Sequence, residues 1–122
     1  MDIQTMHKQI DQKAGQIRSK YITIAPGQEA TYMLKSAQAK AMVASNYTLP
    51  IQGLMEAEMM ATGDTIQVAC IRVITEEKQW EYVTGLIEKL RRPAKLGILN
   101  ASSHEEATVI YEQAIANLAS LL

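Results

Sequence analysis

Apolar side chains return at helical spacing along most of the chain. In the first segment the apolar positions, at steps of three, four or seven, are Ile3, Met6, Ile10, Ile17 and Tyr21. This spacing places them on one stripe of an α-helix. Asp2, just before the stripe, is of a type that caps helix N-termini. The pattern predicts a first helix over about residues 3–21.

Prolines and glycines divide the next part of the chain into shorter helices. The stretch "YITIAPGQ" ends the first pattern, and Pro26-Gly27 suits the centre of a type II turn. A second helix is predicted from about Gly27 or Gln28 to the break at "SNYTLP". Pro50 is predicted in the first turn of a short third helix, which Gly63 ends.

The longest apolar pattern begins after Asp64. Asp64 and Gln67 have capping-box spacing, and a near-heptad seam continues to about residue 92. The seam comprises Ile66, Ala69, Val73, Trp80, Val83, Ile87 and Leu90. Trp80 is in phase with the apolar positions around it and is therefore predicted to pack in this seam.

Pro93 either kinks this long helix or ends it. Ser102 and Ser103, each with a glutamate three residues on, are overlapping capping-box candidates for a last helix. The sequence as a whole predicts an all-α fold of four to five helices with one long central helix, a helical bundle or hairpin in a single domain over residues 1–122.

Composition narrows the function classes. The 122 residues are 48% apolar, with 5% aromatic residues, no Phe and a net charge of −1. A near-neutral chain has no bulk field for nucleic acid or an anionic membrane. The one cysteine, Cys70, forms no internal disulfide, and no apolar run reaches the length of a membrane span. We expect no nucleic-acid partner, no membrane partner and synthesis in a cytoplasm.

Residues that carry chemistry do not form a recognisable pattern. "APGQEATY" lacks the glycines and the Gly-Lys-Ser/Thr ending of a phosphate loop, so it is interpreted as a hinge between two helices. His7, Cys70 and His104 share no metal-ligand spacing. The sequence predicts no catalytic, cofactor-binding or metal residue, no cofactor and no small-molecule substrate, hence no enzyme.

Two short runs are candidate partner surfaces. Met55, Met59 and Met60 cannot all face one core on a short helix, and adaptable Met side chains are common at interfaces. The alternative is that Met60 lies half-buried at the domain edge. The cations Arg91, Arg92 and Lys95 can grip an acidic partner or a phosphate, or simply favour the dipole at a helix C-terminus.

The order of three longer segments carries a resemblance. These are "IDQKAGQIRSKYITIAPGQEATYMLKSAQAKA", "MEAEMMATGDTIQVA" and "WEYVTGLIEKLRRPAKLGILNA". Together they resemble a helical module associated with the tail fibres of tailed bacteriophages and prophages, over about residues 10–101. The matching residues are Ile10, Asp11, Gly15, Arg18, Tyr21, Ile22, Thr23, Pro26, Gly27, Gln28, Thr31, Tyr32, Lys35, Thr62, Gly63, Trp80, Ile87, Glu88, Arg91 and Arg92.

The resemblance implies a structural role for these residues. Most such modules have no assigned activity, so no catalytic residue is carried over; Pro26 and Gly27 would make the turn, and Tyr21, Tyr32 and Trp80 would anchor packing. Pro93 departs from the module, which usually continues as uninterrupted helix. The expected function is that of a non-enzymatic phage structural or assembly protein, made in the host cytoplasm, with the virion as a further candidate location.

A second expected function belongs to another class: a small phage accessory protein that binds and inhibits or sequesters a host factor, such as a defence factor. A cryptic enzyme is the third. For a structural or assembly protein the partners are proteins, including further copies of the chain. The long seam and the Met residues suggest self-association, with dimer and trimer both open, against a compact monomer.

Overall fold

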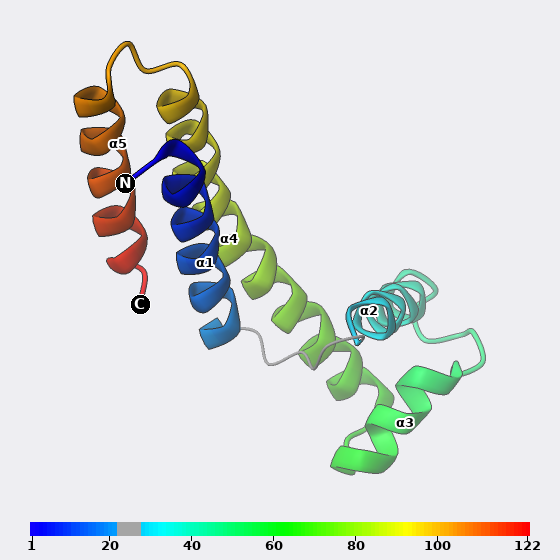
Figure 1. The fold of residues 1–122 in the computed structure, drawn as a ribbon. Coiled ribbons are helices and arrows are strands. Elements are labelled where there is room, and N and C mark those ends of the chain that lie inside the picture. Colours follow the sequence, from blue (N-terminus) through cyan, green and yellow to red (C-terminus); the bar gives the residue numbers. More distant parts are fainter. Residues whose placement is uncertain (22–27) are drawn as a thin grey trace. The chain divides into compact units, whose positions relative to one another are not determined.

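A computed structural model describes residues 1–21 and 28–122 (Figure 1). Over these residues the fold is all-α, which confirms the predicted fold class, and one helix is much longer than the others. The helices are α1 (Ile3–Tyr21), α2 (Glu29–Ala44), α3 (Gly53–Thr62), α4 (Ile66–Leu99) and α5 (His104–Ala119).

The chain groups into two compact units. The first comprises Met1–Thr23 with Glu81–Leu122, and the second comprises Ile24–Trp80. The long helix α4 contributes its C-terminal part to the first unit and its N-terminal part to the second. The single domain expected over residues 1–122 stays a prediction.

In the first unit, α1 and α5 run parallel to each other and antiparallel to α4. The Tyr21 hydroxyl donates to the Leu121 carbonyl at 2.8 Å, and His104 Nε2 lies 2.7 Å from the Met1 carbonyl. Matching ends of α1 and α5 therefore meet (Figure 1). The fully or nearly fully buried core residues are Met6, Ile10, Ala14, Ile17, Ile87, Ala94, Ile98, Ala107, Ala114 and Leu118.

In the second unit, α2 and α3 pack with the first turns of α4. The Leu54 amide at the start of α3 donates to the Gln38 side chain at 3.1 Å, and Lys35 reaches Glu58 one turn further along α3 at 2.8 Å, so α2 and α3 run antiparallel. The buried core residues are Ala39, Met42, Met55, Ala69, Cys70 and Val73.

Several helix ends agree with the sequence signals. The Asp2 carboxylate accepts from the Thr5 amide at 2.7 Å, so Asp2 caps α1 as predicted. Of the overlapping candidates before α5, Ser103 is the cap, because its hydroxyl accepts from the Glu106 amide at 3.1 Å. Gly63, at φ 76°, ends α3 in the left-handed conformation that glycine adopts without a Cβ penalty.

Two predicted helix starts were wrong. Thr65, not Asp64, caps α4: its hydroxyl accepts from the Val68 amide at 3.3 Å, while the Asp64 carboxylate pairs with Arg72 instead. Pro50 does not lie in the first turn of α3, which begins at Gly53. Residues 45–49 make turn hydrogen bonds, and the left-handed φ values of Asn46 and Tyr47 carry the chain away from helical geometry before Pro50.

Pro93 does not end the long helix, which continues to Leu99. Pro93 itself is exposed, whereas Ala94 and Ile98 beyond it are buried in the first-unit core. Burial of these two side chains favours a continued helix, and water can solvate the carbonyl that the proline leaves unpaired.

The predicted seam of α4 is divided between two cores. Val73 packs in the second-unit core, whereas Val83 and Ile87 pack in the first-unit core. Trp80, between them in sequence, is half-buried. The near-heptad spacing therefore serves two separate sets of partner helices instead of one continuous coiled-coil stripe.

Candidate functional site

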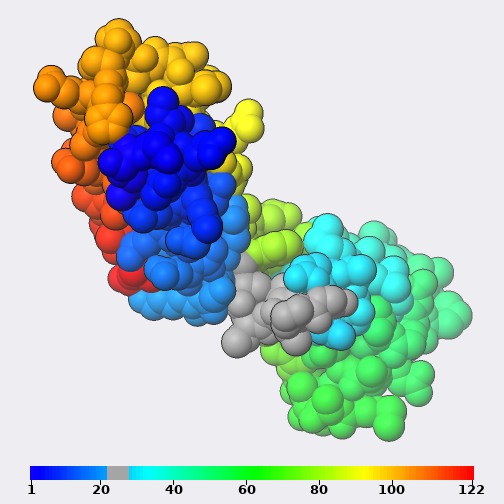
Figure 2. Space-filling model, in the orientation of Figure 1, coloured from blue at the N-terminus to red at the C-terminus, as the bar shows by residue number. Residues whose placement is uncertain are grey.

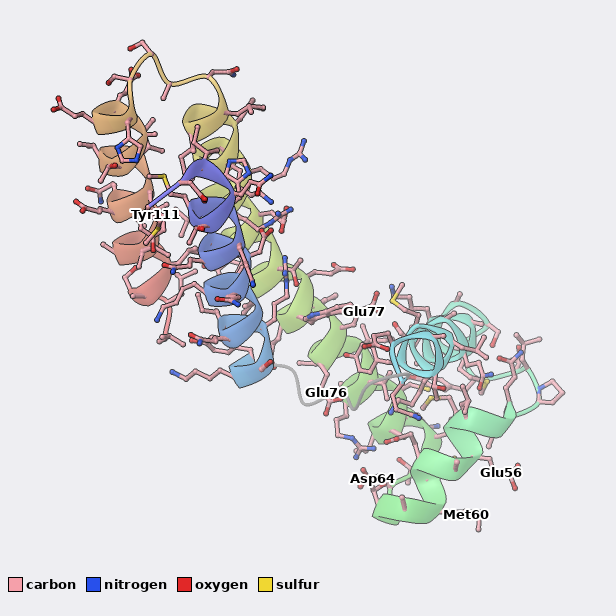
Figure 3. The ribbon with its side chains drawn as sticks, viewed as in Figure 1. Glu56, Met60, Asp64, Glu76, Glu77 and Tyr111 are labelled. Carbon is pink, nitrogen blue, oxygen red and sulfur yellow. The ribbon has the colours of Figure 1, made fainter. Side chains whose placement is uncertain are left out.

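Helix α3 places its three methionines in three different environments. Met55 is fully buried and Met59 is partly buried against the same core. Met60 is 80% exposed and projects from α3 away from α2 (Figure 3). Met55 and Met60 are five residues apart, about 140° around a helix with 3.6 residues per turn. Met55 is therefore a core residue, and its prediction as part of a partner surface was wrong. Met60 is exposed and not half-buried at the domain edge.

Met60 borders a surface depression that we call the α3 hollow. Its volume is about 490 Å³, and it is lined by Ile51, Glu56, Met59, Met60, Gly63 and Asp64. Ile51, in the segment before α3, is 41% exposed. Atoms of α3, coloured green, lie at the surface on the face that Figure 2 shows. The hollow thus combines accessible apolar side chains with two carboxylates.

One carboxylate of the α3 hollow is neutralised and the other is not. Asp64 pairs with Arg72, which also reaches Glu58 at 3.0 Å, and Lys35 donates to Glu58 at 2.8 Å. The Lys35 hydrogen bond, partly opposed by burial, lowers the pKa of Glu58. Glu56 is exposed and has no ion-pair partner among the described residues. Glu56 therefore leaves one unbalanced negative charge beside Met60.

The predicted basic surface is largely occupied within the chain. Arg91 contacts Glu88 at 2.9 Å and Asp11 at 2.9 Å, and Lys95 contacts Asp11 at 2.8 Å. Burial opposes ionisation of Asp11, but hydrogen bonds from Lys95 and Arg91 outweigh it and lower the pKa of Asp11. Arg91 and Lys95 thus link α4 to α1. Arg92, also predicted for this surface, is exposed.

A groove between α4 and α5 was not predicted from the sequence. Its volume is about 480 Å³, and its lining residues are Lys89, Leu90, Pro93, Ala94, Gly97, Val109, Ile110, Gln113, Ala114 and Asn117. Small side chains leave the space: a Cβ added at Gly97 would lie 3.4 Å from Ile110 Cδ1. Lys89 is the single charged residue in this lining. The signal in the sequence was the small residues one turn apart on α4, Ala94 and Gly97, together with Ala114 on α5.

A buried polar cluster joins α2 to α4 within the second unit. Lys40 donates to Glu77 Oε1 at 2.8 Å, and Glu77 is only 7% exposed. Tyr32 meets Trp80 edge to face, with ring centroids 5.8 Å apart. Burial and the nearby charges of Glu76 and Glu77 raise the pKa of Tyr32. The buried polar atoms here without a hydrogen-bond partner are Ser36 Oγ, Glu77 Oε2 and Trp80 Nε1.

The polar side chains of this cluster that belong to α2 lie on one face of that helix. Ser36 lies one helical turn from both Tyr32 and Lys40, so the three side chains share the face of α2 towards α4. The Glu77 carboxylate is paired with Lys40, and Ser36 Oγ has no hydrogen-bond partner among the described residues that would activate it as a nucleophile. We interpret the cluster as a set of polar contacts that hold α2 against α4.

The remaining candidates for chemistry lie apart. Cys70 is buried in the second-unit core, and burial raises the pKa of its thiol. His104 is exposed at the start of α5. Within residues 1–21 and 28–122, no three His, Cys, Asp or Glu side chains converge to hold a metal ion.

The predicted hinge at "APGQEATY" is only partly described. Residues 25–27, with the Pro-Gly pair, lie outside the described residues. Gln28 precedes α2, and Glu29–Tyr32 form its first turn. The end of this stretch is therefore helical.

No family model, curated protein or solved structure matches this chain. None of the helices, over the part of the chain that is described, has the length and apolar character needed to cross a membrane.

Proposed function

We propose that this protein is a non-enzymatic structural or assembly protein of a tailed phage or prophage, associated with tail fibres, and that it acts through protein–protein contacts. The phage assignment rests on the ordered sequence segments that resemble the tail-fibre-associated module. The proposal that the protein acts through protein–protein contacts rests on a single observation in the structure, the exposed apolar surface around Met60.

Met60 is 80% exposed and stands beside Ile51, which is 41% exposed, at the α3 hollow. Single exposed apolar residues are common, but apolar side chains that line a depression together are a feature of protein-binding surfaces. Methionine suits such a role because its unbranched side chain adapts to the shape of a partner.

The proposal is tested in a phage or prophage that encodes this chain. Particles are purified through a density gradient, and the protein is sought in them by mass spectrometry. A deletion strain is compared with the parent for infectious particles and for particles that carry fibres. We expect the deletion to lower the yield of fibred, infectious particles while leaving DNA replication and lysis unchanged.

A matched pair of variants links the phenotype to the surface. Met60→Ser should reproduce the deletion in part, whereas Met33→Ser, at an exposed methionine of α2 outside the α3 hollow, should behave as the parent. Normal fibred particles from the deletion strain would contradict the proposal. A deletion that instead restores a host defence response would favour the inhibitor function.

A further inference from the structure

We propose that the α3 hollow of one copy docks into the α4–α5 groove of a second copy, so that the protein associates head to tail. This inference rests on the proposed function, because it assumes that the surface around Met60 contacts a protein. It names a second copy of the chain as that protein. The evidence is the match of shape and charge between two separate surfaces of the chain.

The Met60 side chain at the edge of the α3 hollow is complementary in shape to the groove. Met60 is a protruding apolar side chain, 80% exposed. The α4–α5 groove is a depression of about 480 Å³ with Ala94, Gly97 and Ala114 in its lining. Small residues at these positions let an incoming side chain approach the helix backbones closely, and a flexible methionine fills an irregular space at low strain. Val109, 66% exposed on the α5 edge, supplies further apolar area.

The two surfaces are also complementary in charge. Glu56 is the unpaired carboxylate of the α3 hollow, because Asp64 is bound to Arg72. Lys89 is the single charged residue in the groove lining, and it forms no ion pair among the described residues. Each surface therefore presents one unbalanced charge, and the signs are opposite. Such pairing across an interface sets orientation and excludes wrong partners.

The spacing of these residues fits a docked arrangement in which α3 runs parallel to α4 of the second copy. Glu56 and Met60 are four apart on α3, and Lys89 and Pro93 are four apart on α4. Residues at this spacing share a helix face, about 6 Å from each other. When Glu56 reaches Lys89 and α3 runs parallel to α4 of the second copy, Met60 lies over the groove at Pro93, one turn before Gly97.

The contact joins two different surfaces, so it does not stop at a dimer by symmetry. Each copy that uses its α3 hollow still has a free groove, and the next copy can bind there. Association of this kind produces either a ring or an open chain. With rising concentration the average mass should therefore pass twice the chain mass, where a symmetric dimer stops.

The test uses charge reversal in the full chain. Glu56→Lys and Lys89→Glu are each made alone and together, with helix content checked by circular dichroism. Sedimentation equilibrium is measured from about 10 µM to about 1 mM, the range of weak specific contacts. We expect the parent to exceed its chain mass of 13.5 kDa progressively, and each single variant to associate at least about tenfold more weakly.

Mixing the two single variants should restore association, because the intact hollow of one variant meets the intact groove of the other. The double variant should associate again by itself, through the exchanged charges. Met60→Ser should weaken association, and Met33→Ser should not. These outcomes separate a head-to-tail contact from a symmetric α3–α3 contact, in which Lys89→Glu would change nothing.

A parent chain that stays at 13.5 kDa throughout the range, or a Lys89→Glu variant that associates like the parent, would overturn the head-to-tail contact. Neither result bears on the particle experiment, which fails only if the chain is dispensable for fibred particles. A chain that self-associates but is dispensable for particles would leave the docking inference standing without the phage function.

Discussion

At the scale of single residues, side-chain type alone did not reveal the role of the α3 methionines. Met55 and Met60 carry the same side chain on one ten-residue helix, yet one is fully buried and the other is 80% exposed. Their difference comes from the helical phase of α3 relative to the second-unit core. Sequence signals also placed Pro50 in the first turn of this helix, which begins at Gly53.

Met55→Ala should destabilise the protein far more than Met60→Ala. Truncating a buried methionine loses its burial and leaves a cavity, at a cost of about 2–5 kcal/mol. The same change at the exposed Met60 should stay within about 0.5 kcal/mol. Urea denaturation followed by circular dichroism measures both; equal losses for the two variants would contradict the placement of α3.

The ion pair of Glu58 predicts a loss of stability in acid. Its pKa is lowered in the folded state from the ordinary value of 4.5, chiefly by the Lys35 hydrogen bond. The unfolded chain therefore binds this proton more readily, so the contribution is present above about pH 4.5 and is lost as pH falls through the folded-state pKa.

Glu58→Gln should consequently weaken the protein at pH 7 and differ little from the parent at pH 3. Glu56→Gln, on the same helix but without an ion pair, is the control and should behave like the parent at both pH values. The urea midpoint at each pH gives the answer, and a Glu58→Gln effect as large at pH 3 as at pH 7 would argue against the pairing.

At the scale of elements, α4 shows that a proline did not decide where a helix ends. Pro93 is exposed while its neighbour Ala94 is buried. The helix therefore continues through Pro93, despite the hydrogen bond lost there, because this places Ala94 and Ile98 in the core.

We predict that Pro93→Ala stabilises the protein, by about 1–3 kcal/mol, since alanine restores the missing hydrogen bond and removes the clash. A higher urea midpoint checks this; a lower one would show that α4 needs the proline geometry.

The cap of α5 predicts a smaller effect. Ser103→Ala removes the acceptor for the Glu106 amide and should cost about 1 kcal/mol, whereas Ser103→Asp keeps an acceptor and should cost little. Thermal unfolding of the two variants, measured against the parent, distinguishes a cap from a solvated serine.

Much of the helical architecture was predictable because it depends on local signals. Asp2, Ser103 and Gly63 act on the few residues around them, and the apolar stripe of α1 needs no knowledge of its partner. The α4–α5 groove and the ion pairs of Arg91 and Lys95 with Asp11 were not predictable in the same way. They depend on which helices lie side by side, and Asp11 meets partners that are 80 and 84 residues away in sequence.

At the scale of the whole molecule, two apolar cores share one helix. The first core is built on α1, α5 and the C-terminal part of α4, and the second on α2, α3 and its N-terminal part. Local opening often occurs in cooperative units of this kind. The effect of a core mutation on local opening should therefore fall mainly on the helices that share its core.

We predict that Met55→Ala speeds hydrogen exchange in α2 and α3 while leaving α1 and α5 close to the parent. Ile10→Ala, at a buried site of the first core, should give the reverse pattern. Mass spectrometry of deuterated peptides resolves exchange in each of the helices α1–α5. A uniform increase along the chain in both variants would show one cooperative unit, as the single-domain expectation requires.

The parallel pairing of α1 with α5 has a consequence for synthesis on the ribosome. All helices of the second unit up to Trp80 are available before the last third of the chain is made. The first core, by contrast, needs Leu118 of α5 together with Met6 of α1. Until α5 emerges, the apolar stripe of α1 lacks one of its covering helices, so the nascent chain exposes that stripe for most of its translation. Chaperone binding during synthesis should therefore fall on α1.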